Sequence, residues 1–599
     1  MDVVCVAAFV ILLTSFYCGC DGNLRFASYY GDHMVLQKSP QRAVLWGYFG
    51  SEGAHVTVSL SGPINQKTSS AAVTEGTLEQ WAVIHSARGA WGYGGTSAVR
   101  RTPAVSFTNL FESGNQTANL PVTGRPLTTE PRLKCSTMWY PHICIWKVTL
   151  NPVDAGGPYT VTAASDNSTV NLTDVMFGDI WLCGGQSNMY FPTSQIFNAS
   201  EELSLSPKYP HVRPFMAALR MNETELIDLI EVQLPWSVPT ASVVGEFSAV
   251  CWLFGRYMYD KLKYPIGLVE SCWGGTPVEA WSSLRALRQC GLEQNEDSPK
   301  EKNSVLWNAM IHPLLSMTIY GAIWYQGSIA VKDGACSVYS VTDGASVGFF
   351  ILPGEANADY HRDKYNCSFP ALIDDWRMAF HQGSGGQTAL DFPFGFVQLD
   401  TYKDGPTDDG FAEIRWHQTA DVGFVPNPRM KKTFMAVAFD LPDKTSPYGT
   451  IHPRDKQDVA YRLTLGARAV AYGEKDVPFL GPFPKQIVST DVFVIVTYDR
   501  AASVTPSKDI FEIFCSVSKH PHGPKSQWVP AAIETWGPTT VLLSATYCQP
   551  PDEVTALRYA WKDSPCDFKA CPIYSATGIL PAPPFIVSRY SDRENTWKS

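Results

Sequence analysis

The sequence predicts an α/β protein with a largely parallel sheet that carries helices on both faces, flanked by two β-rich regions. From about residue 174 to 481, short apolar runs alternate with loops and helical patterns. That alternation is typical of a parallel sheet covered on both faces. On either side, branched and aromatic residues cluster between Gly, Pro and Ser turns, which favours small β-domains of the sandwich type.

A chain of 599 residues is too long for one compact core, so we expect several domains. Composition and hydrophobic pattern suggest the following division. A signal peptide covers 1–21, an N-terminal β-domain 22–173, the α/β domain 174–481 and a C-terminal β-domain 482–599.

The charge balance excludes one class of partner. The formal net charge is −10 and the pI is near 5.7, which argues against nucleic acid as the main partner. Beyond the leader, no stretch is apolar for long enough to span a membrane, and no Cys and His spacing makes a zinc pattern. We therefore expect no membrane span after signal cleavage and no zinc site of that kind.

The N-terminus resembles a secretory signal. Val3 to Phe16 is almost wholly apolar and is followed by small residues around Gly19, although Asp2 replaces the usual leading Lys or Arg. Six N-x-Ser/Thr sequons fit export as glycosylation sites. They begin at Asn115, Asn167, Asn171, Asn198, Asn222 and Asn366.

Export would also place most of the 15 cysteines in an oxidising compartment, where disulfides form. Cys566 with Cys571, and Cys515 with Cys548, are plausible pairs on sequence distance. Connectivity cannot be deduced from the sequence, so both pairs are expectations.

Individual elements follow from local pattern. In the N-terminal region, 42–48 and 55–60 have the composition of strands, whereas about 82–145 has no period and predicts an irregular insert. The α/β region predicts helices at 247–262, 305–317 and 455–472, and strands at 175–183, 265–271, 320–325, 394–399 and 433–441. The C-terminal region predicts strands at 492–498, 510–515, 539–545 and 556–561.

The organising stretch is Asp179 to Met189, in which a buried strand ends at Gly184 and Gly185 and Ser187 follows. Glycine allows a tight turn there, and a serine just past it exposes its hydroxyl at the carboxyl end of the strand. Ser187 is a candidate nucleophile. The alternative is that it only caps a helix.

Three further motifs follow predicted strands, and the carboxyl ends of parallel strands share one rim. They are Trp273-Gly274-Gly275, Gln326-Gly327, and Asp440 followed by His452. Together with Ser187 they supply what acyl transfer needs. His452 is the candidate base, and the N–H groups of Ser187 and Gly274 with the amide of Gln326 would form an oxyanion hole.

Each assignment has an alternative. His452 could be an ordinary surface histidine, and His417 competes for the role of base. Gly274 could be a simple turn residue and Gln326 a buried hydrogen-bonding residue. Asp440 is the leading candidate to orient His452, with Asp455 or a backbone carbonyl as rivals.

Taken together, these motifs resemble those of sialate O-acetylesterases, which are SGNH-type hydrolases. The resemblance rests on 185–189, 273–281, 324–327 and 451–456, and runs from Arg25 to Phe585. It implies a serine esterase, secreted or lysosomal, that removes O-acetyl groups from sialic acids, notably at the 9-position, without metal or cofactor. It assigns nucleophile and base to Ser187 and His452, and oxyanion roles to Gly274, Gln326 and Asn357.

The chain departs from the family pattern in three places. Gly184 stands where the family has serine, and Gly449 where SGNH enzymes often have aspartate. In the family Trp-Tyr-Gln-Gly runs directly into Glu-x-Asn, but here roughly 27 extra residues, Ser328 to Gly354, precede Glu355-Ala-Asn357. Both irregular segments, 82–145 and 328–354, are natural surface loops, retained introns or gene-model errors. We hypothesise that the second damages the oxyanion hole.

Two other functions stay open at this stage. The first is an acetylesterase acting on a plant polysaccharide such as acetylated xylan. The second is a carbohydrate-binding protein with a decayed hydrolase site, which the insert after Gly327 favours and the retained Ser187 and His452 oppose.

Overall fold

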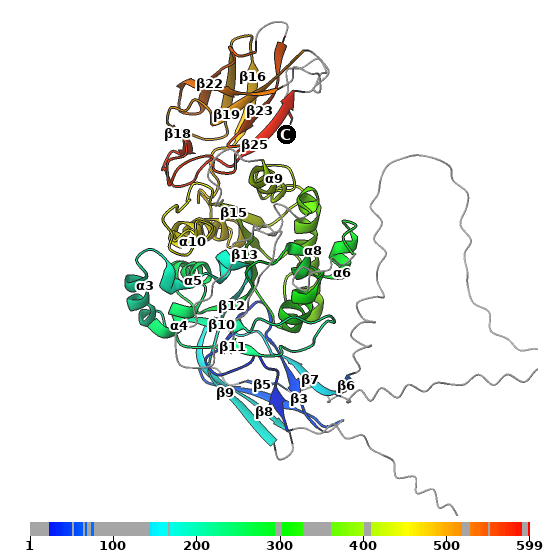
Figure 1. The fold of residues 1–599 in the computed structure, drawn as a ribbon. Helices are drawn as coiled ribbons and strands as arrows, with labels where there is room; N and C mark the ends of the chain where they lie inside the picture. The colour runs from blue at the N-terminus through cyan, green and yellow to red at the C-terminus, as the bar shows by residue number, and fades with distance from the viewer. Residues whose placement is uncertain are drawn as a thin grey trace, which may run out of the picture.

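A computed structural model gives the fold (Figure 1). It describes residues 23–50, 53–63, 66–68, 74–76, 143–165, 168–293, 302–326, 361–400, 409–517, 527–548, 552–589 and 597–598. The signal peptide, the second insert, Asn357, Asn115 and Asn167 lie outside this part of the chain. So does most of the first insert, whose last residues belong to strand β7.

The centre of the molecule is a sheet of strands in the order β11-β10-β12-β9-β13-β14-β15. All neighbours along it are parallel except β11 and β10. The bounds are β9 Ser168–Gly185, β10 Val212–Ala217, β11 Val232–Leu234, β12 Ile266–Cys272, β13 Gly321–Tyr325, β14 Phe394–Gln398 and β15 Thr433–Val437.

Helices cover both faces of this sheet, as the sequence predicts (Figure 1). Because side chains alternate along a strand, neighbouring residues enter different cores. Trp181 packs in the core that holds α5 and α10, and Leu182 in the core that holds α8. The helices are α2 Ser187–Tyr190, α3 Ala199–Leu205, α4 Ala241–Glu246, α5 Ala249–Leu262, α6 Leu284–Arg288, α8 Tyr365–Gly383, α9 Gly410–His417 and α10 Lys456–Gly466.

Strand β9 joins the N-terminal region to the central sheet. Its first half pairs with β8 and β2, and its second half lies between β12 and β13. The expected domain boundary at residue 173 therefore falls inside one continuous strand. The N-terminal strands are β1 Arg25–Phe26, β2 Val35–Gln37, β3 Val44–Tyr48, β4 Thr57–Ser61, β5 Gln66–Thr68, β6 Thr74–Gly76, β7 Ile143–Thr149 and β8 Gly156–Ser165.

The C-terminal region is built from short antiparallel strands, as its sequence pattern predicts. In Figure 1 it lies beyond α9 and β15 at one end of the molecule. Its strands are β16 Pro484–Ser489, β17 Phe493–Tyr498, β18 Ala502–Val504, β19 Phe511–Val517, β20 Gln527–Ala531, β21 Ile533–Trp536, β22 Thr540–Ser544, β23 Asp552–Tyr559, β24 Ile573–Ser575, β25 Phe585–Arg589 and β26 Trp597–Lys598.

Two predicted helices differ in detail. The stretch 305–317 forms a π-helical turn at Trp307–Ile311 and a 3₁₀ turn at His312–Leu314. Helix α10 ends at Gly466 and continues as a π-helical segment to Ala471. Helix α8 was not predicted; it contains Pro370 in its second turn, where proline has no N–H to donate to the carbonyl four residues before it.

Both suggested disulfides form, Cys515–Cys548 and Cys566–Cys571. The structure adds Cys183–Cys251, which ties the end of β9 to α5, and Cys290–Cys367. These bonds join segments far apart in sequence, which is why spacing alone did not reveal them.

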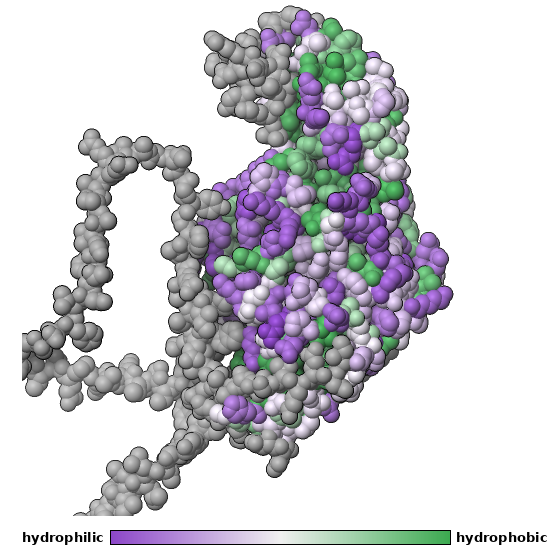
Figure 2. Space-filling view, turned by 180° about the vertical axis from the view of Figure 1, so that it is seen from behind, coloured by the Kyte–Doolittle hydropathy of each residue, from purple (hydrophilic) through white to green (hydrophobic). Residues whose placement is uncertain are grey.

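In Figure 2 hydrophilic residues spread over much of the visible face, with hydrophobic residues in small groups between them. That pattern is ordinary for surface helices with one buried side. Within the described ranges, none of the helices is both long and apolar enough to cross a bilayer.

Candidate active site

The turn after β9 depends on a glycine. Gly185 has a φ of +130°, and a Cβ built there would lie 2.3 Å from the carbonyl oxygen of Tyr325. The next residue, Gln186, donates its N–H to that same oxygen at 3.0 Å. Only a residue without a side chain lets β9 pass so close to the end of β13. This contact places Ser187 at the rim of the sheet.

Ser187 is the first residue of α2 and does not act as its cap. Gln186 holds the N-cap position, and no side chain caps this helix. The Ser187 side chain is only 6% exposed, yet its hydroxyl makes no hydrogen bond to the described residues. Its N–H, at the start of a helix, has no acceptor within the helix. The helix-cap alternative is therefore excluded for this serine.

His452 has the tautomer that a general base requires. Its Nδ1 lies 2.9 Å from the carbonyl oxygen of Tyr448. A carbonyl oxygen only accepts, so Nδ1 carries the proton and Nε2 of the neutral ring is left with its lone pair. The ring also stacks on Phe191, with centroids 5.9 Å apart and planes 20° from parallel.

The surroundings of His452 keep it neutral. The pKa of His452 is lowered from 6.5 to about 4, chiefly by burial and also by the positive charge of Lys456, while the Tyr448 hydrogen bond opposes the shift. Burial disfavours the charged imidazolium because the protein interior solvates it poorly. Near neutral pH the imidazole is able to accept a proton.

Asn188 joins the serine turn to the histidine loop. Its side-chain Nδ2 donates to the carbonyl of Ile451 at 2.9 Å, and its Oδ1 accepts from Nζ of Lys456 at 2.7 Å. Asn188 directly follows Ser187, and Ile451 directly precedes His452. Both Asn188 and Lys456 are buried, so these two bonds form in a low-dielectric setting.

Ser187 and His452 are not hydrogen-bonded to each other in the structure. Catalytic hydrogen bonds of free enzymes are often long and tighten when substrate binds. The two hydrogen bonds of Asn188, to Ile451 and Lys456, are called the Asn188 interlock here. They bring Ser187 and His452 to the same part of the rim, as the sequence analysis expects.

Gly274 lies against the candidate nucleophile. A Cβ at this position would be 3.1 Å from Cβ of Ser187. Its neighbour Trp273 donates to the carbonyl of Gly185 at 3.1 Å, which fixes this loop on the serine turn. Within the described residues the Gly274 N–H has no acceptor. Because Gly274 has no side chain, the space beside Ser187 stays open for the substrate. A backbone N–H at this place is the kind of donor that an oxyanion hole needs.

Gln326 is placed near this rim but is fully buried. Its Nε2 donates to the carbonyl of Thr276 at 3.1 Å, and its Oε1 accepts from the Trp324 indole at 3.3 Å and the Tyr365 hydroxyl at 3.1 Å. In this arrangement the amide braces the 273–277 loop. The other expected oxyanion residue, Asn357, lies outside the described residues.

Asp440 does not orient His452. Both of its carboxylate oxygens bind Arg462, at 2.6 and 2.8 Å, and one also accepts from Tyr574 at 2.9 Å. The ring of His452 is held by the Tyr448 carbonyl, the third candidate of the sequence analysis. The expectation of an Asp440 triad acid is wrong because Arg462, fully buried beside it, needs the carboxylate as its partner.

The two rival residues also have other roles. His417 lies at the end of α9, with Nδ1 2.6 Å from Asp421. Asp455 caps α10 by accepting from the N–H of Asp458 at 3.0 Å. Neither contacts Ser187 or His452.

In the part of the chain that the structure describes, no group of three His, Cys, Asp or Glu side chains is placed to hold a metal ion. Of the sequons within that part, Asn171 and Asn198 are exposed. Asn222 and Asn366 are half-buried, and the amide of Asn366 donates to Asp421 at 2.6 Å.

Comparison with known proteins decides the family. The mouse sialate O-acetylesterase is 43% identical over 94% of this chain and 94% of its own length. The human sialate O-acetylesterase is also 43% identical, over 94% of this chain and 92% of its own. This chain belongs to the sialate O-acetylesterase family. By family it is a carboxylic ester hydrolase.

Two further comparisons agree. Residues 485–589 match the model of the sialate O-acetylesterase C-terminal domain. The crystal structure of a carbohydrate acetylesterase from Xanthomonas citri superposes with a TM-score of 0.66 at 24% identity, over 94% of this chain and all of that one. That likeness supports the fold that the sequence predicts for this family member.

Two buried side chains of this sialate O-acetylesterase family member, Asn188 and Lys456, were not predicted from the sequence, and the carbonyl that orients His452 was not identified as that of Tyr448. Asn188 and Lys456 stand in the very motifs that carry the resemblance, and both are polar residues in otherwise buried surroundings. A polar residue that is buried needs a partner, and this requirement was the available signal.

Proposed function

We propose that this chain is a serine esterase that removes O-acetyl groups from sialic acids, with preference for the 9-O-acetyl position. The observation that carries the proposal is the Asn188 interlock, which brings Ser187 to a neutral His452 with its Nδ1 proton on the Tyr448 carbonyl. The names of the mouse and human relatives supply the substrate class, an O-acetylated sialic acid or sialoglycoconjugate.

The reaction takes two steps. Ser187 Oγ attacks the acetyl carbonyl carbon while its proton passes to Nε2 of His452; the sugar oxygen leaves and takes that proton, so an acetyl-serine remains. A water molecule then loses a proton to His452 and attacks the acetyl carbon, which releases acetate and returns the proton to Ser187. The N–H groups of Ser187 and Gly274 stabilise the oxyanion in both steps.

Secretion or delivery to a lysosome is part of the same proposal. The leader and the disulfides suit an oxidising route of export. A histidine that stays neutral well below pH 6.5 suits an acidic compartment.

The test is hydrolysis of a 9-O-acetylated sialic acid by the secreted chain and by its Ser187→Ala variant. Ser194→Ala, an exposed serine seven residues further on, is the matched control. We expect acetate release that disappears only in the Ser187 variant. Folded protein that releases no acetate, or equal release by all three proteins, would contradict the proposal.

A second candidate substrate is an acetylated polysaccharide, because the superposed bacterial protein is a carbohydrate acetylesterase. A panel of 9-O-acetyl sialic acid, 4-O-acetyl sialic acid and acetylated xylan separates the two. A higher kcat/KM on xylan would replace the sialic acid assignment. A folded protein that binds these sugars without turnover would indicate a decayed site.

A further inference from the structure

We propose that the C-terminal domain positions His452, through Tyr574 and Lys569 at the two ends of the loop that carries it. This loop runs from Asp440, just after β15, to Asp455, the N-cap of α10. The inference rests on the proposed function, because it assigns His452 as the base. Tyr574 and Lys569 act through the loop and touch no substrate, so they are positioning residues.

The first end of the loop is anchored at Asp440. The Tyr574 hydroxyl, on β24, donates to Oδ2 of Asp440 at 2.9 Å. The backbone carbonyl of Asp440 accepts from the N–H of Lys569 at 2.7 Å. Asp440 is fully buried and pairs with both terminal guanidinium nitrogens of Arg462 on α10. Two residues of the C-terminal domain thus bind the same buried residue of the α/β domain.

The second end is anchored at Asp455. Nζ of Lys569 lies 2.8 Å from Asp455 and 3.0 Å from Asp458. The same Asp455 carboxylate caps α10 through its other oxygen. Lys569 lies in a short loop that the Cys566–Cys571 disulfide closes, which limits how far it can move. One residue of the C-terminal domain therefore contacts both ends of the His452 loop.

Between its ends, the loop is held by its own bonds, so displacement of the ends moves His452. Arg454 forms a bidentate pair with Asp443, at 2.6 and 3.0 Å. Ser446 donates to the carbonyl of His452 at 2.8 Å, and the N–H of His452 donates to Gly449 at 2.9 Å. A loop braced in this way transmits a shift rather than absorbing it.

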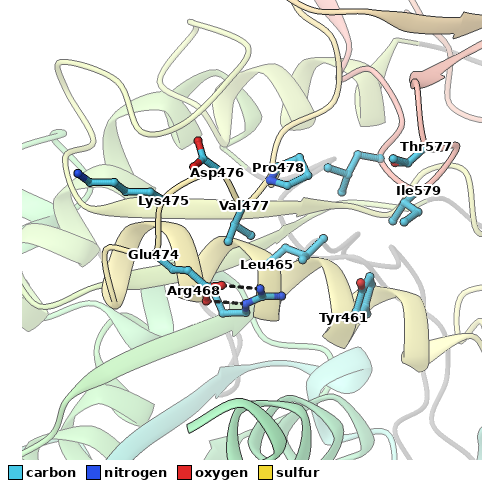
Figure 3. A pocket seen from close by; sticks show the side chains of 11 residues that line it. Tyr461, Leu465, Arg468, Glu474, Lys475, Asp476, Val477, Pro478, Thr577 and Ile579 are labelled. Carbon is cyan, nitrogen blue, oxygen red and sulfur yellow. Dashed lines mark hydrogen bonds and ion pairs between the residues drawn. The ribbon is translucent and has the colours of Figure 1, made fainter.

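The C-terminal domain also faces α10 away from these anchors. Figure 3 shows Thr577 and Ile579 of that domain facing Tyr461 and Leu465 of α10 across a hollow of about 250 Å³. Next to the His452 loop, the ring centroids of Phe568 and Phe197 lie 6.5 Å apart. Thr577 and Ile579 thus lie beside the helix that follows His452.

The variants Tyr574→Phe and Lys569→Met each remove one anchor and keep the side-chain shape. Tyr547→Phe and Lys562→Met are matched controls in the same domain. Tyr547 is 68% exposed, and Lys562 pairs with Asp509, away from the loop. For each protein we would measure kcat and KM on 9-O-acetyl sialic acid, the rate of Ser187 labelling by a fluorophosphonate, and the melting temperature.

We expect each anchor variant to lose about tenfold in kcat with KM nearly unchanged, because a misplaced base slows chemistry more than binding. Labelling should slow in parallel, and Lys569→Arg should recover most of the rate. The controls, Tyr547→Phe and Lys562→Met, should have the kcat and labelling rate of the wild type. The inference would be overturned if folded Lys569→Met and Tyr574→Phe keep the wild-type kcat and labelling rate. It would also be overturned if their activity falls only in proportion to the unfolded fraction.

The labelling rate separates this inference from the proposed function. It reports the Ser187 and His452 geometry without any sugar ester. If the wild type labels at Ser187 but does not release acetate from the sialic acid, the substrate assignment fails, and labelling of the anchor variants still decides the positioning role. If acetate release depends on Ser187 but both anchor variants keep the wild-type kcat and labelling rate, only the positioning role fails.

Discussion

The side-chain amide of Asn188 donates to the carbonyl of Ile451 at 2.9 Å, which links the residue after Ser187 to the residue before His452. The two are 263 positions apart in the chain. The same amide accepts from Lys456 at 2.7 Å, so one side chain connects the serine turn, the histidine loop and the start of α10. The relative position of nucleophile and base depends on this residue.

Two substitutions of Asn188 separate its two bonds. Asn188→Asp keeps an acceptor for Lys456 but has no donor for Ile451, whereas Asn188→Leu removes both. We expect both variants to lose about tenfold or more in kcat, because the loops are no longer fixed together. Only the leucine variant should lose a further roughly 1–3 kcal/mol in unfolding free energy, since a buried cation loses an acceptor. Activity assays and urea unfolding test this. Unchanged kcat in Asn188→Asp would show that the Ile451 bond does not matter.

The pKa of His452 predicts how activity depends on pH. Because burial lowers that pKa to about 4, the acidic limb of kcat/KM should lie near pH 4, well below the 6.5 of a free histidine. Lys456→Met removes a nearby positive charge and should move the limb to higher pH, and the exposed Lys475→Met should not. Rate profiles from pH 3.5 to 8 test this, and a limb at 6.5 in the free enzyme would contradict it.

The same shift affects stability. The folded pKa lies below the unfolded one, so acid protonates the unfolded chain first and stability falls as pH drops from 6.5 toward 4. The loss attributable to His452 is on the order of 3 kcal/mol. The test is to measure the unfolding free energy of the wild type and of His452→Gln by urea unfolding at pH 7 and at pH 4.5. An equal loss in both proteins would mean that His452 contributes nothing.

Gly274→Ala should damage the oxyanion hole without unfolding the protein. The new methyl group would be 3.1 Å from Cβ of Ser187 and would occupy the space above the nucleophile. We expect kcat to fall about tenfold to a hundredfold. Gly275→Asn is the control, because a Cβ there meets no atom within 4 Å and asparagine tolerates its φ of +71°. If both variants keep wild-type kcat, Gly274 is not part of the hole.

The insert after Gly327 gives a fifth prediction. Deleting residues 328–354 restores the direct run from Trp324 to Asn357 that the family pattern has, and we expect ester turnover to rise. Deleting an equal length from the first irregular segment, residues 85–111, is the control. Comparable turnover with and without 328–354 would refute the damage hypothesis.

Much of the central domain could be predicted because its signals are local. Ser248 precedes an apolar helical pattern, and its hydroxyl caps α5 by accepting from Cys251 at 3.2 Å. The strands that lead to Ser187 and Gln326 are apolar runs that end in glycine or polar residues, and both form where expected. Helix α8 was missed because it is buried on many sides and contains Pro370, which blurs its period.

The orientation of His452 illustrates what pattern could not settle. From the sequence, Asp440, Asp455 and a carbonyl were all eligible. Asp440 was excluded only because Arg462 and Tyr574 hold it, and these lie 22 and 134 positions further along the chain. No local signal encodes which partner a buried carboxylate takes.

By itself the sequence determined the α/β class, the strand ends that carry Ser187, Gly274 and Gln326, and the family through its motifs. Those features depend on periodicity and on backbone requirements such as the glycine turn, which act within a few residues. Only the tertiary structure decided that Tyr448 orients His452, that Asn188 joins the two loops, and that the C-terminal domain binds Asp440 and Asp455. Those choices depend on which buried polar groups meet in space, because each must find a partner once water is excluded.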